Sequence, residues 1–528
     1  MKKVAHIPFL EIDSIPVLIK DFLTQKIPGF EGQFFNFENM EKQIALKAEN
    51  FSGKNRQILC DVLAAQYSDF TLTEKQQENL GLLAAKNTFT VTTGHQLNLF
   101  TGPAFFIYKI LQTIKTAEVL KAKFPTSNFV PIFWMASEDH DFDEINHFKT
   151  TENYYEIGGK SGGAVGRIKI EDTFFISQFE EEFKDSVFGT ELILLLKKAY
   201  KKGNTLSEAT RIIVQEIFSE YGLLALDGDN TDLKSLMKPV FKEELLKQDL
   251  NKNSAQIVAF LSEKYGKVQV NPRDINLFYL SETRDRIVFE NGKFEIVDKN
   301  LNFSEDEILS QLENHPERFS PNALMRPVYQ ETVLPNLAYI GGNAEIMYWL
   351  ELKDYFAEIS LPFPVLIPRN SMLMLEEKTL SKIEKFDLKA ADFFKNFAVV
   401  TKNILLSGNE ILPFLEQQEE VLKNHFNDLK KRAALTEKTF GNLVEAEETR
   451  QLKSFGRMKK RLLRAEKIKQ SEKMERLENL FSTIHSGNTW QERIYNFSVF
   501  YADFGREWLE LCYDEMDVKK SELIIFTI

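Results

Sequence analysis

The chain has 528 residues and a formal net charge of −12 at pH 7, with 43% hydrophobic and 27% charged residues. This composition is typical of a globular protein with two or more compact units, and the negative charge argues against a general polyanion binder. Two cysteines, Cys60 and Cys512, exclude a disulfide framework and favour a reducing compartment, so we expect a cytoplasmic protein. The N-terminus lacks the apolar run of a signal peptide, and no stretch of about 18 apolar residues predicts a membrane span.

The first 85 residues are predicted to be mostly helical and carry no sharp motif. A strand over residues 88–91 and a loop over residues 93–103 follow. A helix then runs to about residue 123, because Phe106, Ile110 and Ile114 recur at helical spacing. A second strand over residues 129–136 completes a βαβ unit, which predicts two parallel strands.

The second of these strands ends in an acidic segment. Residues 138–144 contain five carboxylates and His140, and His147 follows. Open α/β sheets bind ligands at the carboxyl ends of their strands, and so much like charge needs protons, a cation or a polar ligand nearby. We therefore predict catalytic or amine-binding roles for four residues: Glu138, Asp139, His140 and Asp141.

Two other interpretations of the acidic segment remain open. On one helical face, His140, either Asp143 or Glu144, and His147 could hold a divalent metal, although we assign no metal ligands. Alternatively, Asp141 is a helix N-cap with Glu144 three residues later, as in a capping box.

Further strands carry polar residues at their ends. Residues 150–215 are predicted to form an insertion or lid with a glycine-rich patch. A strand over residues 222–226 ends in Asp227-Gly228-Asp229. A helix over residues 233–246 and hairpins over residues 268–298 come next. A second βαβ unit has strands at residues 337–340 and 363–367 and a helix over residues 344–356.

The loops at these strand ends supply the candidate binding residues. Backbone N–H groups at a helix start suit phosphate or carboxylate, and an arginine can clamp a carboxylate in bidentate fashion. The alternatives are a tight loop around His95 and structural ion pairs for the arginines. The predicted substrate-binding residues are Thr93, Gly94, His95, Gln96, Arg326, Tyr339, Gly341, Gly342, Glu345 and Arg369.

The last third of the chain is predicted to form a helical arm. No proline follows Leu415, and apolar residues recur at heptad spacing between Leu412 and Leu443, which is typical of a coiled coil. A second, basic helix over about residues 450–484 is expected to run antiparallel to the first. Its basic residues are interpreted as a solvent-exposed helix face rather than a nucleic-acid-binding surface. A helix over residues 497–513 and a strand over residues 523–527, added to an edge of the sheet, return to the core.

We therefore predict an α/β fold with a parallel-sheet core, inserted connecting segments and an antiparallel coiled-coil arm. The predicted domains are a core over residues 1–375, with insertions at about 150–215 and 265–320, an arm over 376–488, and a C-terminal return over 489–528. Heptads of this kind also favour a homodimer.

Three segments together resemble the bacillithiol biosynthesis cysteine-adding enzyme family, BshC. They are TGHQLNLFTGP at residues 93–103, FWMASEDHDFDEINH at 133–147 and RPVYQETVLPNLAYIGGNAEIMYW at 326–349. The resemblance covers the whole chain and implies that the parallel-sheet core is Rossmann-like. It also implies a ligase that joins L-cysteine to glucosaminyl malate through an amide bond. The family often has glutamine where this chain has His95, and Pro-Gly where it has Leu97-Asn98. It has a GGPGE form where this chain has Gly341–Glu345, GGNAE.

The cofactor is left open, although activation of a carboxylate commonly uses a nucleotide such as ATP. The predicted partners are cysteine, glucosaminyl malate and a second copy of the chain, with no nucleic acid and no membrane. Two other functions remain open: a nucleotide- or sugar-binding module without ligase activity, and an interaction protein whose arm carries the function.

Overall fold

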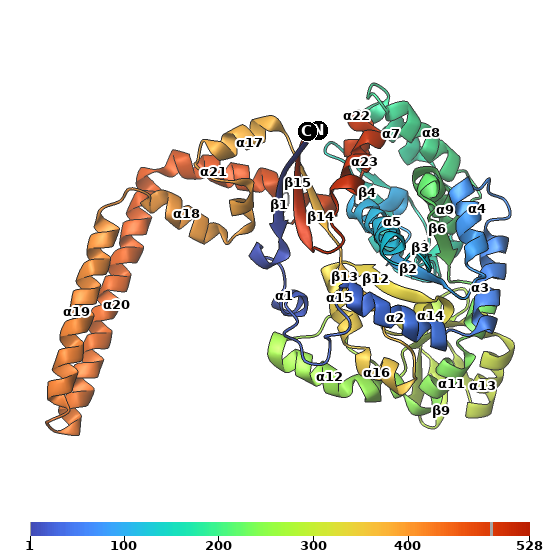
Figure 1. Cartoon of the computed structure of the whole chain (residues 1–528), viewed down its shortest axis with the longest axis horizontal. Helices are drawn as coiled ribbons and strands as arrows, with labels where there is room; N and C mark the ends of the chain where they lie inside the picture. The colour runs from blue at the N-terminus through green and yellow to red at the C-terminus, as the bar shows by residue number, and fades with distance from the viewer. Residues whose placement is uncertain (1, 486–488) are drawn as a thin grey trace. The chain divides into compact units, whose positions relative to one another are not determined.

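The computed structural model describes residues 2–485 and 489–528 (Figure 1). It contains two compact units. The first comprises residues 1–10, 15–373 and 491–526, and the second comprises residues 11–14, 374–490 and 527–528. No helix of the described residues is both long and apolar enough to cross a bilayer.

A five-stranded parallel sheet forms the centre of the first unit, with strand order β13-β12-β2-β3-β6. Its strands are β13 (Val365–Pro368), β12 (Asn336–Gly341), β2 (Thr88–His95), β3 (Asn128–Met135) and β6 (Leu224–Asp227). Nearly every residue of these strands is buried, as expected for a parallel sheet covered on both faces. The predicted α/β core is thereby confirmed.

The chain order of the sheet reverses beside β2. From β2 the chain proceeds outward through β3 and β6, whereas β12 and β13 lie on the other side of β2. Parallel sheets bind ligands outside the carboxyl ends of their strands at such a reversal. In this fold the reversal brings the loop after His95 next to the loop after Gly341.

Helix α5 (Phe105–Lys123) connects β2 to β3, as the helical spacing predicted, and packs against both strands. Ala117 and Leu120 of α5 share an apolar cluster with Phe89 and Val91 of β2 and with Met40 of α2 (Phe37–Asn50). Lys109 is also buried in α5, although it is charged. The other helices of the N-terminal region are α1 (Val17–Leu23), α3 (Gly53–Gln66) and α4 (Glu74–Leu82).

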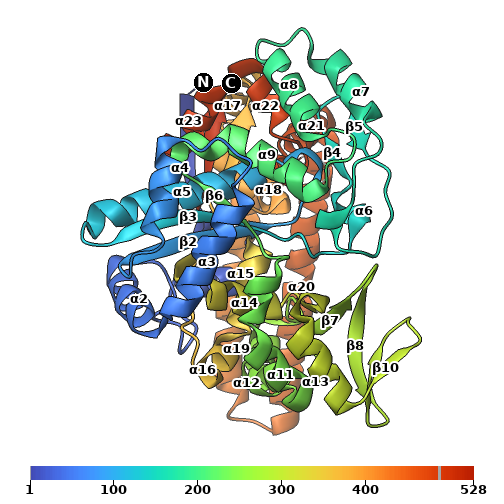
Figure 2. The same ribbon diagram turned by 90° about the vertical axis from the view of Figure 1, so that its right-hand side faces the viewer.

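Two inserted segments interrupt the core (Figure 2). The first follows β3 and consists of α6 (Phe142–Ile145), β4 (His147–Lys149), β5 (Tyr154–Glu156), α7 (Phe174–Phe183), α8 (Gly189–Ala199) and α9 (Leu206–Phe218). The second is an antiparallel sheet with order β10-β9-β8-β7-β11. Its elements are β7 (Leu277–Leu280), β8 (Arg284–Glu290), β9 (Lys293–Ile296), β10 (Leu301–Phe303), α13 (Glu305–Asn314) and β11 (Phe319–Pro321).

Three helices predicted as continuous are broken in the structure. The first becomes α10 (Thr231–Ser235) and α11 (Lys238–Lys247), since Pro239 starts a new helix in its first turn. The second becomes α15 (Asn343–Leu350) and α16 (Lys353–Glu358). The third becomes α22 (Ser498–Phe504) and α23 (Arg506–Glu515), which separate at Gly505 with a φ of 56°. The remaining helices of this unit are α12 (Asp249–Tyr265) and α14 (Met325–Val333).

The prediction that the last strand adds to an edge of the main sheet is wrong. Strand β15 (Glu522–Thr527) is the central strand of a separate sheet, between β1 (Lys2–Pro8) and β14 (Ser371–Leu375). Every residue of β15 is buried, as expected for a strand with neighbours on both sides. The structure also has the strand β1 near the N-terminus, although the first 85 residues are predicted to be mostly helical.

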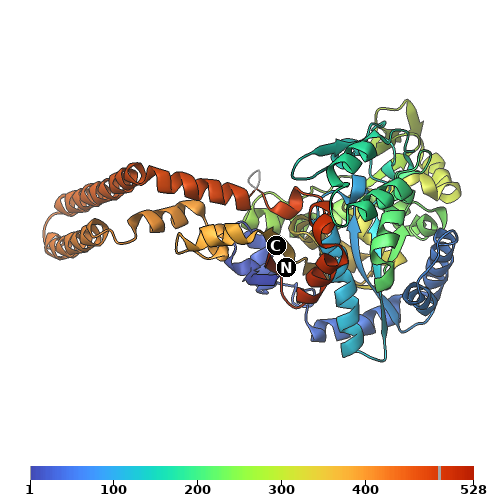
Figure 3. The same cartoon turned by 90° about the horizontal axis from the view of Figure 1, so that it is seen from above.

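The second unit contains a helical hairpin of α19 (Ile411–Ala433) and α20 (Lys438–Lys469), which lie side by side and antiparallel (Figure 3). The predicted coiled coil is confirmed, but its heptads do not lie on one helix, since the chain turns between Ala433 and Lys438. Phe426, Ala433 and Val444 form the small core of the hairpin, whereas Leu443 is 60% exposed. The other helices are α17 (Glu377–Glu384), α18 (Phe397–Leu406) and α21 (Ser471–Ile484).

Candidate functional site

An ion pair spans the point where the sheet order reverses. Lys109 of α5 places its Nζ 2.7 Å from Oε2 of Glu345, in the first turn of α15, and 2.5 Å from the carbonyl oxygen of Gly94. Glu345 also accepts hydrogen bonds from the Tyr339 hydroxyl at 2.7 Å and from the Gly342 N–H at 2.8 Å. The ends of β2 and β12 are therefore tied together by one carboxylate and one ammonium group.

The protonation of this pair follows from its surroundings. Burial alone would raise the pKa of Glu345, but Lys109 and the hydrogen bonds from Tyr339 and Gly342 lower it to about 2. Burial lowers the pKa of Lys109, and the charge of Glu345 works against that decrease. Glu345 is thus a carboxylate across the physiological range.

Arg326 lies beside the same loop. Its guanidinium donates to Oε1 of Gln330 at 2.9 Å, and it contacts the hydroxyls of Tyr339 and Tyr348 at 3.5 and 3.4 Å. Among residues 2–485 and 489–528 it forms no ion pair with a carboxylate. A methyl group at Gly94 would come 3.4 Å from an Arg326 nitrogen. Gly94 therefore lies in van der Waals range of the guanidinium, and Arg326 is half-buried beside the end of β2.

Two carboxylates of the acidic segment, Glu138 and Asp139, have lysine or arginine partners from distant parts of the chain. Lys234 Nζ lies 2.5 Å from Oε1 of Glu138 and 3.4 Å from Oδ1 of Asp229, and its side chain is fully buried. Arg167 contacts both oxygens of Asp229, at 2.6 and 2.7 Å. Burial raises the pKa of Glu138, and Lys234 opposes that rise. Glu138 is thus placed in a buried ion pair.

Asp139 and Gln96 connect the loops after β3 and β2. The Gln96 amide donates to Oδ2 of Asp139 at 2.8 Å and to Oε2 of Glu144 at 2.8 Å. Burial alone would raise the pKa of Asp139, but hydrogen bonds from His140 and Gln96 and the charge of Arg284 hold it well below its usual range. Asp139 is therefore a stable negative charge and a weak base.

His140 is oriented by Arg284 from the second insertion. The Arg284 guanidinium donates to Nδ1 of His140 at 3.0 Å, and it also donates to Ser320 Oγ at 2.8 Å and Pro321 O at 2.6 Å. Because a guanidinium has no acceptor, this contact is a hydrogen bond in the tautomer that carries its proton on Nε2, and Oδ1 of Asp139 lies 3.5 Å from the same Nδ1. The side chain of His140 is 41% exposed, so the Nε2–H group can reach a bound molecule.

Asp141 has the capping role that the helix-start interpretation predicted. It is the N-cap of α6, and its side chain accepts from the Glu144 N–H at 3.2 Å. The helix ends at Ile145, and His147 begins β4, so the expectation of His140, Glu144 and His147 on one helical face is wrong. No group of three metal-ligating His, Cys, Asp or Glu side chains gathers anywhere in the described residues.

The side chains of His95 and Thr93 contact other residues of the protein core. The His95 ring packs against Phe105 and Phe106, with centroids 5.2 and 5.3 Å away, and burial together with Lys109 lowers its pKa to about 3. The imidazole is thus neutral at physiological pH. The Thr93 hydroxyl donates to the carbonyl of Ile340 at 2.8 Å, which joins β2 to β12.

Arg369 is held in a buried ion pair, as one of its two interpretations predicted. Its guanidinium contacts both carboxylate oxygens of Glu492, at 2.7 and 3.1 Å, and the two side chains are 4% and 0% exposed. The side chain also lies over the Phe105 ring. A substrate-binding role for Arg369 stays a prediction, and this geometry does not favour it.

The start of α15 does not fit a phosphate group. The Gly342 N–H, which a phosphate would use, is already bonded to the Glu345 carboxylate, and that carboxylate would repel an anion. Lys109, the nearest cation, is neutralised by the same group. The expectation that Gly341 and Gly342 expose a phosphate-binding helix start is therefore not supported.

Comparison with known proteins gives a family. The model "Bacillithiol biosynthesis BshC, N-terminal Rossmann-like domain" matches residues 4–370, and "Bacillithiol biosynthesis BshC, C-terminal coiled-coil domain" matches residues 372–528. The chain belongs to the BshC family. A relative from Flavobacterium johnsoniae named "Putative cysteine ligase BshC" is 42% identical over 97% of both chains. A relative of the same name from Flavobacterium psychrophilum is 40% identical over 94% of both chains. Another, from Christiangramia forsetii, is 38% identical over 99% of this chain and 98% of its own.

Burial keeps the His95 imidazole uncharged at physiological pH, so it presents a neutral hydrogen-bonding group. A proton-transfer role for His95 is accordingly disfavoured.

Four residues of this BshC site were missed from the sequence. Three are cations that the fold brings from distant segments: Lys234, Arg284 and Arg167. Their sequence neighbourhoods carry no local signal. The fourth, Lys109, stands alone among apolar residues in the middle of a predicted buried helix, and that contrast could have revealed it.

Proposed function

We propose that this BshC family member joins L-cysteine to glucosaminyl malate by forming an amide between the cysteine carboxyl and the sugar amine. The observation that carries the proposal is the match along 97% of the chain to a named cysteine ligase. The site at the ends of β12, β2 and β3 supports it, because cationic, anionic and hydrogen-bonding side chains converge there. The chemistry forms a C–N bond while the amine nitrogen loses a proton and the activated carboxyl loses its leaving group.

Arg326 is the proposed binding residue for malate. Its positive charge has no carboxylate partner among the described residues, and the half-buried side chain lies beside Gly94 at the end of β2. A guanidinium can hold a carboxylate through two parallel hydrogen bonds. Tyr339 and Tyr348 fix its plane from the protein side.

Asp139 and His140 are the proposed groups beside the reacting atoms. Asp139 stays ionised and can hold the ammonium form of an amino group by charge and hydrogen bonding. His140 presents Nε2–H, which can donate to the oxygen that becomes negative when the amine attacks the carbonyl carbon. Glu138 and Asp141 then have structural roles: Glu138 pairs with Lys234, and Asp141 caps α6.

Amide formation from a free carboxylate requires activation, for which a nucleotide such as ATP is a common agent. The residues at Gly341 and Gly342 do not fit its phosphates, as the bond from Gly342 to Glu345 indicates.

The test is product formation from cysteine, glucosaminyl malate and a nucleotide, followed by mass spectrometry. We expect Asp139→Asn and His140→Ala each to lower kcat by about tenfold or more, as loss of one preorganised charge or donor does. Asp143→Asn is the matched control, since this exposed carboxylate lies in the same segment. Unchanged rates in both variants would remove the acidic segment from the chemistry. Ligand binding without turnover in the wild type would favour the binding-module alternative.

We also infer a homodimer formed through the hairpin of α19 and α20, in a cytoplasmic enzyme. Apolar side chains remain exposed on this hairpin, among them Phe414 at 59% and Phe440 at 45%, and a second copy could cover them. The free thiols Cys60 and Cys512 support a reducing compartment. Sedimentation velocity of the wild type and of Phe414→Glu with Phe440→Glu tests the dimer, and a monomeric wild type would contradict it.

A further inference from the structure

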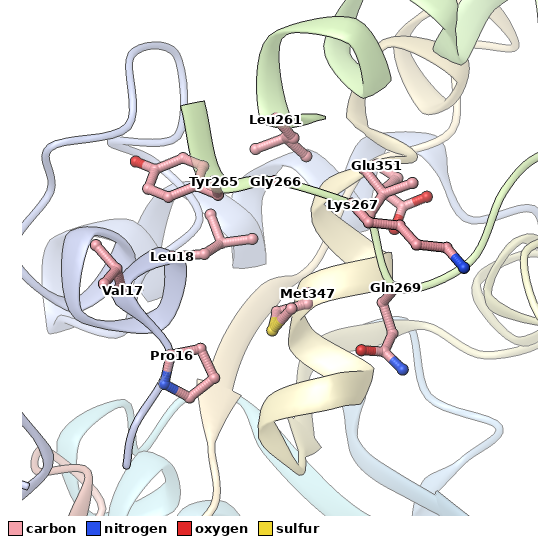
Figure 4. Close-up of a pocket in the computed structure, with 11 residues that line it drawn as sticks. Pro16, Val17, Leu18, Leu261, Tyr265, Gly266, Lys267, Gln269, Met347 and Glu351 are labelled. Carbon is pink, nitrogen blue, oxygen red and sulfur yellow. The ribbon is translucent and has the colours of Figure 1, made fainter. Parts of the chain in front are cut away.

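A separate pocket of about 240 Å³ lies in the first unit, between α1, α15 and the segment that follows α12 (Figure 4). Its wall is mainly apolar. The apolar lining residues are Pro16, Val17, Leu18, Leu261, Val268 and Met347. This volume is slightly below that of drug-sized ligand sites, so it suits a molecule of a few carbon atoms.

One acidic side chain in this lining lacks the partners that a buried carboxyl needs. Glu351 at the end of α15 is 1% exposed, and its carboxyl group accepts backbone hydrogen bonds from Gln269 and Val270, the latter to Oε1 at a long 3.4 Å. Its Oε2 is buried without a hydrogen-bond partner among the described residues. Burial raises the pKa of Glu351 to about 8. A buried carboxyl in this state costs free energy that a suitable partner would recover.

The surroundings provide no internal cation for Glu351. Lys267 lines the same pocket, but it is exposed and forms no ion pair with Glu351. In Figure 4 its side chain extends away from the apolar residues of α1. The pocket therefore combines an apolar body with one unpartnered acidic oxygen.

We propose that this pocket binds a small primary amine with an apolar body, whose ammonium group pairs with Glu351 while its carbon chain packs against Leu18, Leu261 and Met347. This site is distinct from the residues proposed to form the amide, and it does not depend on that function. An ammonium is favoured over a neutral group because its charge stabilises the ionised form of Glu351, whose pKa burial raises, and because it donates to Oε2; the Glu351 proton passes to solvent as the ammonium binds.

The test uses 3-methylbutylamine as the probe, with 3-methylbutan-1-ol and 3-methylbutanoate as neutral and anionic analogues. Binding to the full chain is followed in methyl NMR spectra through Met347, assigned with Met347→Leu. We expect the amine to shift the Met347 methyl signal at millimolar concentration, the alcohol to bind at least about tenfold more weakly, and the acid not to bind. Equal binding of amine and alcohol, or no shift with any probe, would overturn the proposal.

Variants separate the pairing from general hydrophobic binding. Glu351→Gln keeps the shape of the side chain and should weaken amine binding by about tenfold or more, whereas Glu358→Gln, an exposed control on α16, should leave it unchanged. Val17→Lys adds a competing cation at a position that is 65% exposed, so it should weaken binding without unfolding the protein. Lys267→Met should leave amine binding intact or strengthen it. Undiminished amine binding in both Glu351→Gln and Val17→Lys would refute the pairing.

Discussion

Lys109 and Glu345 form an ion pair at 2.7 Å across the reversal of strand order, and the same lysine also binds the Gly94 carbonyl. Each partner comes from the helix that follows one of the two adjacent strands, β2 or β12. The pair therefore fixes the loops around Gly94 and Gly342 relative to each other, and Arg326 is presented beside them.

Glu345→Gln should destabilise the protein by about 3 kcal/mol at pH 7, because it leaves the buried Lys109 without its counter-charge. Denaturant unfolding of the full chain measures this change, with the exposed Glu358→Gln as the control. The double variant Lys109→Met, Glu345→Gln should recover part of the loss. If its loss of unfolding free energy equals the sum of the losses of Lys109→Met and Glu345→Gln, the two side chains do not interact.

The stability of the wild type should depend on pH through Glu345. Its pKa in the folded protein is about 2, below the ordinary value of 4.5. The stabilisation is therefore complete above pH 4.5 and is lost as the pH falls toward 2, by about 3 kcal/mol at most. The Glu345→Gln variant should show a flatter stability profile between pH 5 and 2, measured by thermal unfolding. Parallel profiles for the two proteins would contradict the assigned shift.

His95→Gln should keep most of the activity, and it should leave the pH profile of kcat unchanged between about pH 5 and 9. The reason is that the imidazole, with a pKa of about 3, is already neutral over this range. His140→Gln provides the contrast, since that side chain lies in the proposed reaction site. A large loss of activity in His95→Gln with a wild-type fold would restore His95 as a catalytic candidate.

Arg284→Met should lower kcat more than it raises KM for either substrate, because Arg284 orients His140 without reaching the substrate itself. The guanidinium fixes the tautomer of His140 through its bond to Nδ1. NMR of the His140 ring nitrogens gives an independent readout: the Nε2–H form should dominate in the wild type and lose that dominance in the variant. Arg286→Met, from the exposed part of the same strand, should change neither.

Phe426→Ala should destabilise the arm by about 3 kcal/mol, since it removes the largest side chain of the core of the hairpin. Phe414→Ala is a matched control on the same helix, because Phe414 is 59% exposed. Hydrogen exchange in α19 and α20 measures both effects. Equal protection in the two variants would contradict the packing of this hairpin.

The parallel core could be predicted from the sequence because its strands are continuous apolar runs joined by helices of recognisable period. The clustering of polar residues at the ends of these strands was predictable for the same reason. The partners of those residues were not, since Lys234 and Arg284 come from segments about 100 or more residues beyond Glu138 and His140 in the chain. The sequence showed an excess of negative charge, and only the tertiary structure shows that Lys234 and Arg284 pair with Glu138 and Asp139 within it.

The arm illustrates another limit. Apolar residues at a regular spacing of seven continue from Leu412 to Leu443, yet the chain turns after Ala433. A heptad pattern reports that a helical face is apolar, but it does not report where the chain reverses. No proline or glycine lies between Ala433 and Lys438, so the turn has no strong local signal.

The most direct test of the central claim, that Arg326 at the reversal of strand order binds the malate group for amide formation, is the steady-state kinetics of cysteine addition to glucosaminyl malate. We predict that Arg326→Gln raises the KM for glucosaminyl malate by about tenfold or more, with a smaller change in the KM for cysteine, while Arg286→Gln matches the wild type. An unchanged KM for glucosaminyl malate in a correctly folded Arg326→Gln protein would contradict the account.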